Sequence, residues 1–137
     1  MIGIDQSSAV SINDQIKTGL RGLVARGLLK PGDPAPSIRN LAASLKVNPN
    51  TVARAFRELA AEGFIEARRG DGNYIAAGVS SQVRHAMDIE REALVGALRK
   101  ARRGGLRWNE ILDVLNRMKK EEPSDADERL RHTAWGR

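Results

Sequence analysis

Residues 36–65 read PSIRNLAASLKVNPNTVARAFRELAAEGFI, and this stretch decides the fold. Ser37 is a good N-cap, because its hydroxyl can accept a hydrogen bond from a free amide in the first turn of a helix. Apolar residues then recur at helical spacing, at Ile38, Leu41, Ala42 and Leu45. The pattern predicts a short amphipathic helix that ends near residue 46.

A second helix follows almost immediately. Asn48 can cap it, and Pro49 suits its first position, where a missing N–H costs nothing. Gly63 ends it, and its apolar face is formed by Val52, Phe56, Leu59 and Ala60. Only residues 46–48 separate the two helices, so they can share one core only by crossing steeply. This arrangement is a helix-turn-helix.

The second helix keeps polar side chains off its apolar stripe, at Asn50, Thr51, Arg54 and Arg57. Arg39 of the preceding helix is expected on the same side. A recognition helix meets base edges or phosphates with such side chains, particularly in its first turn. From the helical pattern alone, an ordinary helical hairpin with a solvated polar face stays open as an alternative.

The next segment indicates a β-hairpin. Two short apolar runs, 64–67 and 74–75, flank residues 68–73, which read RRGDGN. An Asp-Gly pair between two short strands is a strong hairpin signal. Because this hairpin follows a helix-turn-helix and carries Arg68 and Arg69 near its tip, it predicts the wing of a winged helix.

Residues 11–77 resemble the DNA-binding domain of the GntR family of bacterial transcription regulators. The matching motifs are SINDQI and LLKPGDPAPSIRNLAASLKVNPNTVARAFRELAAEGFIEARRGDGNYI. The chain departs from the family pattern at four positions. Ala35 stands where Leu is usual, Asn13 where an aromatic is common, and Pro49 and Ala53 where many members have basic residues. Base reading is therefore expected to depend on Asn50, Thr51 and Arg54.

The resemblance and the residue pattern together predict a DNA-binding surface. Arg39 is expected to grip the phosphate backbone or a guanine, and Arg68, Arg69 and Gly70 are expected to place the wing on phosphate or in the minor groove. The full set of expected DNA-binding residues is Ser37, Arg39, Asn48, Asn50, Thr51, Arg54, Arg57, Arg68, Arg69, Gly70 and Gly72.

Upstream of this surface, residues 1–10 are expected to be a loose or extended arm. Residues 11–26 are expected to form a first helix, with Ser11 and Asp14 in capping-box spacing. Residues 28–36 hold three prolines and are expected to be a stiff connector.

Downstream, two helices are expected at residues 80–103 and 106–120, separated by Gly104-Gly105. Ser80 or Ser81 can cap the first of them. Such a pair has too little surface of its own to cover both apolar stripes, so it is expected to dimerise. The expected dimer contacts are Met87, Leu94, Leu98, Trp108, Ile111, Leu112 and Leu115. The alternative is a monomer in which both helices fold back on the winged helix.

The predicted fold is mainly α with a small β-hairpin wing. It divides into a winged helix-turn-helix DNA-binding domain (1–78), a two-helix dimerisation region (79–121) and a flexible tail (122–137). A C-terminal region this short resembles the YtrA-like subfamily of the GntR family, whose members often control transporter operons. The resemblance implies such an operon for this chain by analogy.

Composition agrees with this interpretation. The chain has 137 residues, 23 basic against 17 acidic side chains, a net charge of +6 and a pI near 10.3, which suits a polyanionic partner. Cysteine is absent, and no apolar run approaches the roughly 18 residues of a membrane span. Together with the lack of a signal-peptide pattern, this predicts a cytoplasmic protein that lies close to its DNA.

No catalytic, cofactor or metal site is predicted. The phosphate-cradling, nucleophile and HExxH motifs are missing, and His85 stands on a charged helix face without enough ligands for a metal. A small-molecule effector of unknown identity stays open, with a pocket between the two C-terminal helices near Trp108 and Met87 as its expected site.

The sequence therefore predicts a homodimeric repressor that binds a palindromic operator in double-stranded DNA. A winged-helix adaptor for other proteins and a nonspecific architectural DNA-binding protein are the alternatives.

Overall fold

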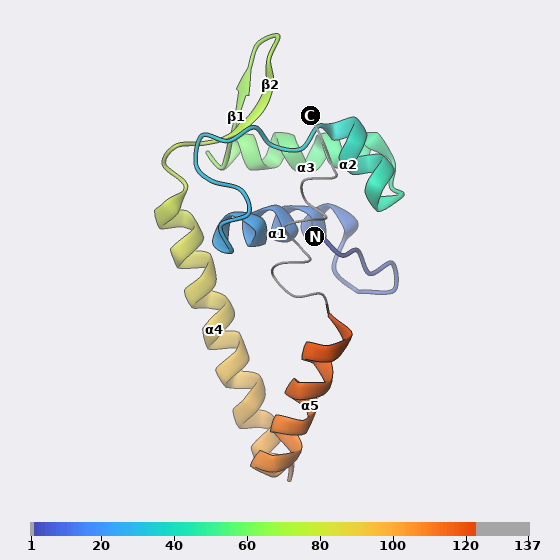
Figure 1. Cartoon of the computed structure of the whole chain (residues 1–137), viewed down its shortest axis with the longest axis vertical. Coiled ribbons are helices and arrows are strands. Elements are labelled where there is room, and N and C mark those ends of the chain that lie inside the picture. The colour runs from blue at the N-terminus through green and yellow to red at the C-terminus, as the bar shows by residue number, and fades with distance from the viewer. Residues whose placement is uncertain (1, 123–137) are drawn as a thin grey trace.

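The computed structural model describes residues 2–122, in which five helices and one antiparallel hairpin follow one another (Figure 1). The tail expected at 122–137 lies, apart from residue 122, outside the described residues. The elements are α1 (Ile12–Ala25), α2 (Ile38–Leu45), α3 (Pro49–Ala61), β1 (Ile65–Arg68), β2 (Gly72–Ile75), α4 (Ser80–Arg103) and α5 (Trp108–Glu121). The predicted fold class, a winged helix-turn-helix followed by two helices, is confirmed.

One apolar core joins the first three helices to the hairpin. Helices α1 and α2 both pack against α3, and Leu20, Leu41 and Leu59 bring a fully buried side chain from each helix. Phe64 and Ile75 add the base of the hairpin to the same cluster. Burying a side chain of this size contributes about 1.5–3 kcal/mol relative to leaving it exposed. The core therefore fixes α2, α3 and the wing relative to one another.

Helix capping follows the sequence pattern. The side-chain oxygens of Ser11, Ser37 and Asn48 each accept a hydrogen bond from a first-turn backbone amide, at 3.1, 3.1 and 2.8 Å. Helix α2 ends at Lys46, whose φ of 56° is left-handed. Val47, next to it, is half-buried against the core. These features make the tight turn between α2 and α3 that the sequence predicts.

The wing is a short ladder whose strands pair from Ile65 opposite Ile75 to Arg68 opposite Gly72. The proline-rich connector lies along the other edge of β2, where the backbone N–H groups of Gly32 and Ala35 donate to Ile75 and Asn73, each at 2.8 Å. The sequence indicates only a stiff loop here. Main-chain pairing satisfies the free edge of β2 and connects the wing to the start of α2.

The N-terminal arm was expected to be loose or extended, and its residues 2–5 dock on α1, so they are not loose. Ile2 is 2% exposed and packs over Gly19 of α1, where an added Cβ would lie 2.6 Å from Ile2 Cγ2. The backbone N–H of Asp5 also donates to Gln15 Oε1 at 2.7 Å. A glycine in α1 thus provides the room that the arm occupies.

Helix α4 begins on the core and then leaves it (Figure 1). The predicted caps Ser80 and Ser81 are wrong, because both lie inside the helix and the residue before it is Val79. Val79 and Val83 are buried in the core and anchor the first turn instead. Beyond that turn, α4 extends away from the DNA-binding unit.

Helix α5 turns back at an angle to α4, after Gly105 with a φ of 107°. It begins at Trp108, two residues later than predicted, and the backbone N–H of Arg107 donates to Glu110 Oε1 at 3.3 Å.

None of the helices in residues 2–122 is long and apolar enough to cross a membrane.

Candidate nucleic-acid interface

The outward face of α3 carries the polar side chains singled out by the sequence. Asn50, Arg54 and Arg57 lie opposite the buried stripe of the helix, and all three are exposed. Thr51 is half-buried at the flank of this face. An exposed amide and two guanidinium groups can donate to base edges and phosphates.

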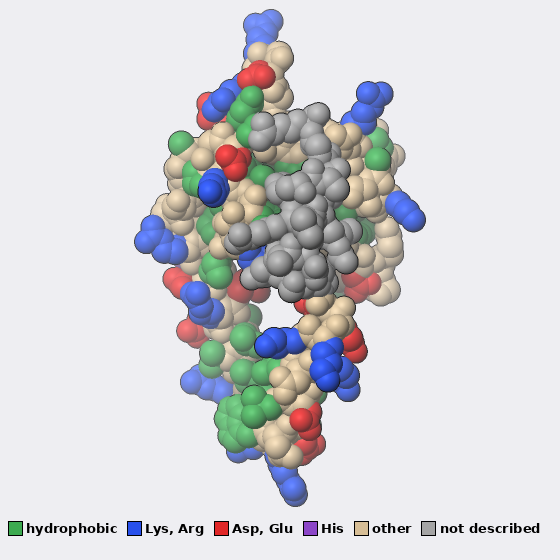
Figure 2. Space-filling view, in the orientation of Figure 1, with side chains coloured by type: hydrophobic (Ala, Val, Ile, Leu, Met, Phe, Trp, Pro, Cys, Tyr) green, Lys and Arg blue, Asp and Glu red, His purple; other side chains and the backbone are tan. Residues whose placement is uncertain are grey.

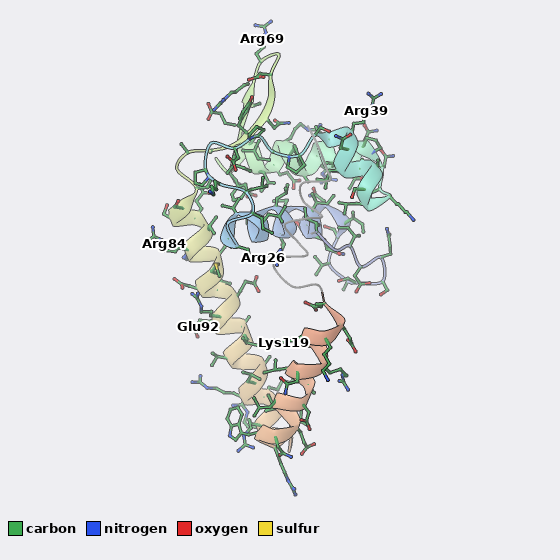
Figure 3. All side chains as sticks on the ribbon, viewed as in Figure 1. Arg26, Arg39, Arg69, Arg84, Glu92 and Lys119 are labelled. Carbon is green, nitrogen blue, oxygen red and sulfur yellow. The ribbon has the colours of Figure 1, made fainter. Side chains whose placement is uncertain are left out.

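Two further arginines extend the surface to either side of α3. Arg39 is exposed on α2, and Arg69 is exposed at the tip of the wing. Figure 3 shows both side chains pointing away from α4 and α5, at the same end of the molecule. The cations of α2, α3 and the wing thus face outward together, as a winged helix on DNA requires.

The two expected cap residues are already engaged. Ser37 Oγ and Asn48 Oδ1 accept from backbone amides at the starts of α2 and α3. Their side chains therefore position the helix N-termini, whose remaining free N–H groups and positive dipole ends favour an anion such as phosphate.

The wing holds its two arginines differently. The Arg68 guanidinium lies over the Tyr74 ring, 3.7 Å from the centroid, and Tyr74 Oη donates to Asp71 at 2.6 Å. This hydrogen bond raises the pKa of Tyr74 above its ordinary value. Arg69, one residue on, extends free of the ladder at the tip (Figure 3). Sequence reasoning grouped the two arginines and missed Tyr74, because stacking depends on which strand face each side chain takes.

The two glycines of the wing make its turn possible. Gly70 and Gly72 have φ values of 77° and 92°, which an L side chain rarely adopts. Both positions have open space around them, so their requirement is conformational.

A ladder of polar contacts fixes α1 against α3. Asn13 Nδ2 donates to Glu58 Oε2 at 2.6 Å, and Lys17 Nζ donates to Glu62 at 2.7 Å while lying 3.4 Å from Glu58. Arg21 also pairs with Glu62. Sequence reasoning noted Asn13 only as a departure from the family pattern. Its partner is 45 residues away, so no local spacing could reveal the contact.

The charges of this ladder shift the acid–base equilibria of its members. The Asn13 amide lowers the pKa of Glu58 below its ordinary range. Desolvation raises the pKa of Glu62, but the Lys17 hydrogen bond and the nearby charges of Arg21 and Lys17 outweigh it and leave a lowered pKa. The hydrogen bond to Glu62 raises the pKa of Lys17. All three groups are charged near neutral pH.

The C-terminal helices leave their apolar residues uncovered. Leu94, Trp108 and Leu112 are 55%, 57% and 56% exposed, and Leu115 is exposed as well. Figure 2 shows apolar side chains gathered over this lower end of the molecule. The alternative, a monomer in which both helices fold back on the winged helix, is not seen in residues 2–122, where α4 packs on α1 and α5 has no comparable contact with the winged helix.

The other expected dimer residues have different surroundings. Ile111 is buried, Leu98 is half-buried, and Met87 packs against the core of the DNA-binding unit. That these residues and the exposed ones form dimer contacts stays a prediction. That each residue of the outward surface contacts DNA also stays a prediction.

The single effector pocket expected near Trp108 and Met87 is wrong. Met87 lines a hollow between α1 and α4 together with Gly22 and Ala25, whereas Trp108 lines another near the α4–α5 turn together with Val95. Met87 and Trp108 line two different hollows that share no residue, so they do not form one pocket.

Two relatives from Bacillus subtilis share sequence with the chain. The HTH-type transcriptional repressor YtrA is 47% identical over 76 residues, which cover 56% of this chain and 58% of the repressor. The uncharacterized HTH-type transcriptional regulator YhcF is 38% identical over 91 residues, which cover 66% of this chain and 74% of that regulator. The chain therefore spans little more than half of the first relative and about three quarters of the second.

A solved structure extends the likeness to most of the fold. The GntR family transcriptional regulator from Listeria monocytogenes superposes with a TM-score of 0.63 at 27% identity, over 83% of this chain and 98% of that one. Residues 12–75 also match the family described as bacterial regulatory proteins, gntR family. The chain thus belongs to the GntR family of bacterial regulatory proteins and is similar to its YtrA-type members.

Proposed function

We propose that the protein is a homodimeric, sequence-specific DNA-binding transcription regulator, and that it acts as a repressor in the cytoplasm. One observation carries the proposal. Arg39 of α2 and Arg69 of the wing point toward one end of the molecule, and the uncovered apolar residues of α4 and α5 lie at the other (Figures 2 and 3). One end is suited to a polyanion and the other to an apolar partner.

The apolar end is best completed by a second copy of the chain. Of the ten large apolar side chains that are exposed in residues 2–122, nine lie between residues 89 and 118. Contiguous apolar patches of this kind mark association surfaces. Helices α4 and α5 each carry a stripe of apolar side chains. Two copies of this helix pair can therefore pack around a two-fold axis and cover both stripes. Residues 1–78 would then bind DNA and residues 79–121 would dimerise.

Dimerisation gives the DNA surface its selectivity. A single small module buries a modest area on DNA, whereas two recognition helices about 34 Å apart contact successive major grooves and require a palindromic site. In this arrangement α3 enters the major groove with Asn50, Thr51 and Arg54. Arg39 contacts backbone or a guanine, and the wing brings Arg69 to the adjacent minor groove.

Repression is proposed from the relative named as a transcriptional repressor, with 47% identity over its matched part. A bound dimer that covers a promoter blocks polymerase without any further activity. Neither hollow is assigned a ligand.

Selection of bound fragments from the genome of the source organism tests the proposal. The expected result is a small set of fragments that share an inverted repeat, with an affinity at least about 1,000-fold above that for scrambled DNA. Sedimentation should show a dimer at micromolar concentration. Equal affinity for all fragments would instead indicate an architectural protein, and the absence of any DNA affinity would indicate an adaptor.

A further inference from the structure

Glu58 of α3 uses its two carboxylate oxygens in opposite directions. Oε2 accepts from Asn13 Nδ2 at 2.6 Å and lies 3.4 Å from Lys17 Nζ, so it faces α1. Oε1 accepts from Arg54 Nε at 3.4 Å, on the side of the outward face. The Glu58 side chain therefore connects α1 to Arg54, an arginine of the proposed DNA surface.

The connection is firm on the α1 side. Asn13 is half-buried, and within residues 2–122 its Oδ1 is a buried atom without a hydrogen-bond partner. A carboxylate accepts hydrogen bonds and donates none, so the Asn13 amide must present its nitrogen to Glu58.

Arg54 is free on its outer side. Its side chain is 69% exposed, and the contact with Glu58 uses the Nε–H, one of the five donors of a guanidinium. The edge formed by Nη1 and Nη2 remains available for a bidentate partner, such as O6 and N7 of a guanine. A long side chain loses rotamer freedom on binding, and holding it in advance reduces that cost.

A carboxylate at this position also has an electrostatic cost. Nonspecific affinity for DNA comes from cations against phosphates, and a negative charge beside Arg54 opposes it. Glu58 should therefore weaken binding to arbitrary DNA while it favours the one arrangement in which Arg54 meets its base. These two effects have opposite signs, and a purely structural residue would not produce them.

We propose that Glu58 is a positioning residue that sets sequence preference: held from α1 by Asn13, it orients Arg54 toward one base pair of each half-site. The proposal rests on the proposed function, because it requires an operator that the protein prefers. It adds a determinant that lies off the outward face itself.

The experiment compares Glu58→Gln with Glu62→Gln. Glu62 is the matched control, because it lies one turn further along the same flank of α3 and pairs with Lys17 and Arg21 of α1. Both variants remove one negative charge and one side of the α1–α3 ladder, and only the first touches Arg54. Affinity is measured by fluorescence anisotropy for the selected operator and for a scrambled duplex, at two salt concentrations.

Glu58→Gln should lower the ratio of operator to scrambled affinity on the order of tenfold. Its affinity for scrambled DNA should stay equal or rise. Glu62→Gln should keep the ratio, and Asn13→Ala should shift it in the same direction as Glu58→Gln but less. In an Arg54→Ala background, Glu58→Gln should change the ratio no further, because the residue it positions is gone. A scan of operator base pairs should locate the lost preference at one position of each half-site.

Several results would overturn the proposal. An unchanged ratio for Glu58→Gln, an equal loss on both duplexes, or an undiminished effect in the Arg54→Ala background each assigns Glu58 to the fold alone. Thermal unfolding of each variant shows whether the fold is kept. Failure of the proposed function looks different, because the wild-type protein itself would then prefer no fragment.

Discussion

The two ends of the molecule differ in how far their apolar side chains are buried. In residues 12–75, Leu20, Leu41 and Leu59 are fully buried against one another's helices. In α4 and α5, Leu94 and Leu112 stay more than half exposed. The first region completes its core with its own chain, as an independently stable unit does. The second has the same kind of amphipathic helices without partners, so its stability depends on what covers it.

The difference is also one of connection. The DNA-binding region is joined by helix caps, by main-chain bonds between the connector and β2, and by the polar ladder between α1 and α3. The pair of helices α4 and α5 is attached to this region chiefly through Val79 and Val83, at the start of α4. The DNA-binding region is therefore the more rigid of the two, as a surface that must match the shape of DNA should be. In the proposed dimer, the α4–α5 pair would set the distance between two such regions.

The largest effect should come from the self-contained core. Leu59→Ala leaves a cavity among α1, α2 and α3, and should lower the free energy of unfolding by about 2–5 kcal/mol. The loss should be the same at low and high protein concentration, since Leu59 is fully buried within its own chain. Urea unfolding at two concentrations measures it. Val10→Ala, at a residue that is 51% exposed, is the control and should change stability by less than about 0.5 kcal/mol.

A charge introduced on α5 should weaken self-association and leave the core of the DNA-binding region intact. Leu112→Glu places a carboxylate on the proposed dimer interface, where it would be buried without a partner. Self-association should weaken at least about 100-fold, by the several kcal/mol that an unpaired buried charge costs. Sedimentation equilibrium measures this, and operator affinity should fall with it while the circular dichroism of the winged helix persists.

The neighbouring residue provides the control for this change. Asp113 lies on the opposite face of α5 and is exposed, so Asp113→Ala should leave the dimer intact. A Leu112→Glu variant that still sediments as a dimer would show that the hairpin is covered in another way, and the contrast between the two regions would lose its basis.

The same contrast explains what the sequence could predict. Helix limits and caps depend on residues within one turn of each other, and Ser11, Ser37 and Asn48 cap as expected. The wing was equally local, because an Asp-Gly pair and two short apolar runs define it. Local signals thus determine most of the DNA-binding region, and helical spacing alone predicts that Arg54 and Arg57 lie off the apolar stripe of α3, where both are exposed.

Most of the features that escaped prediction join distant segments. The connector pairs with β2 some forty residues later, Ile2 packs over Gly19, and Asn13 reaches Glu58. Each depends on the assembled fold and has no periodic signature. The expected Ser80 cap failed for a related reason: burial of Val79 fixes the start of α4, and tertiary packing overrides a local capping preference.

A third change sharpens the assignment of the cationic end. Arg39→Ala should weaken operator binding by roughly 1–3 kcal/mol, because a charged contact to base or phosphate is lost. Arg84→Ala on α4 is the matched control, since it removes an equal charge from an exposed site outside the outward surface (Figure 3). Gel-shift titration measures both. Equal losses for the two variants would mean that net charge, rather than the outward surface, drives binding.

The wing allows a finer version of this test within one hairpin. Arg69→Ala should reduce the salt dependence of binding by about one counterion, because its side chain is free at the tip. Arg68→Ala should have a smaller effect, since that guanidinium is already stacked on Tyr74. The slope of log affinity against log salt for each variant decides between them. A larger slope change for Arg68 would reverse the roles given to the two side chains.

The smallest effect concerns acid stability, and it belongs to the DNA-binding region alone. The pKa of Glu62 is lowered in the folded protein, so the contribution of this group is fully present above its unfolded value near 4.5 and is lost as pH falls through the folded value. Because the side chain is 41% exposed, solvent screening keeps this contribution below about 1 kcal/mol.

Glu62→Gln should therefore lower stability slightly at pH 7 and flatten its decline below pH 4.5. Lys17→Met should do the same from the other side of the ladder, since it removes the hydrogen bond that lowers this pKa. Thermal unfolding across the acid range measures both variants. If the acid decline of either variant matches that of the wild-type protein, the ladder does not couple α1 to α3 through charge. The recognition helix would then be held by its apolar core alone.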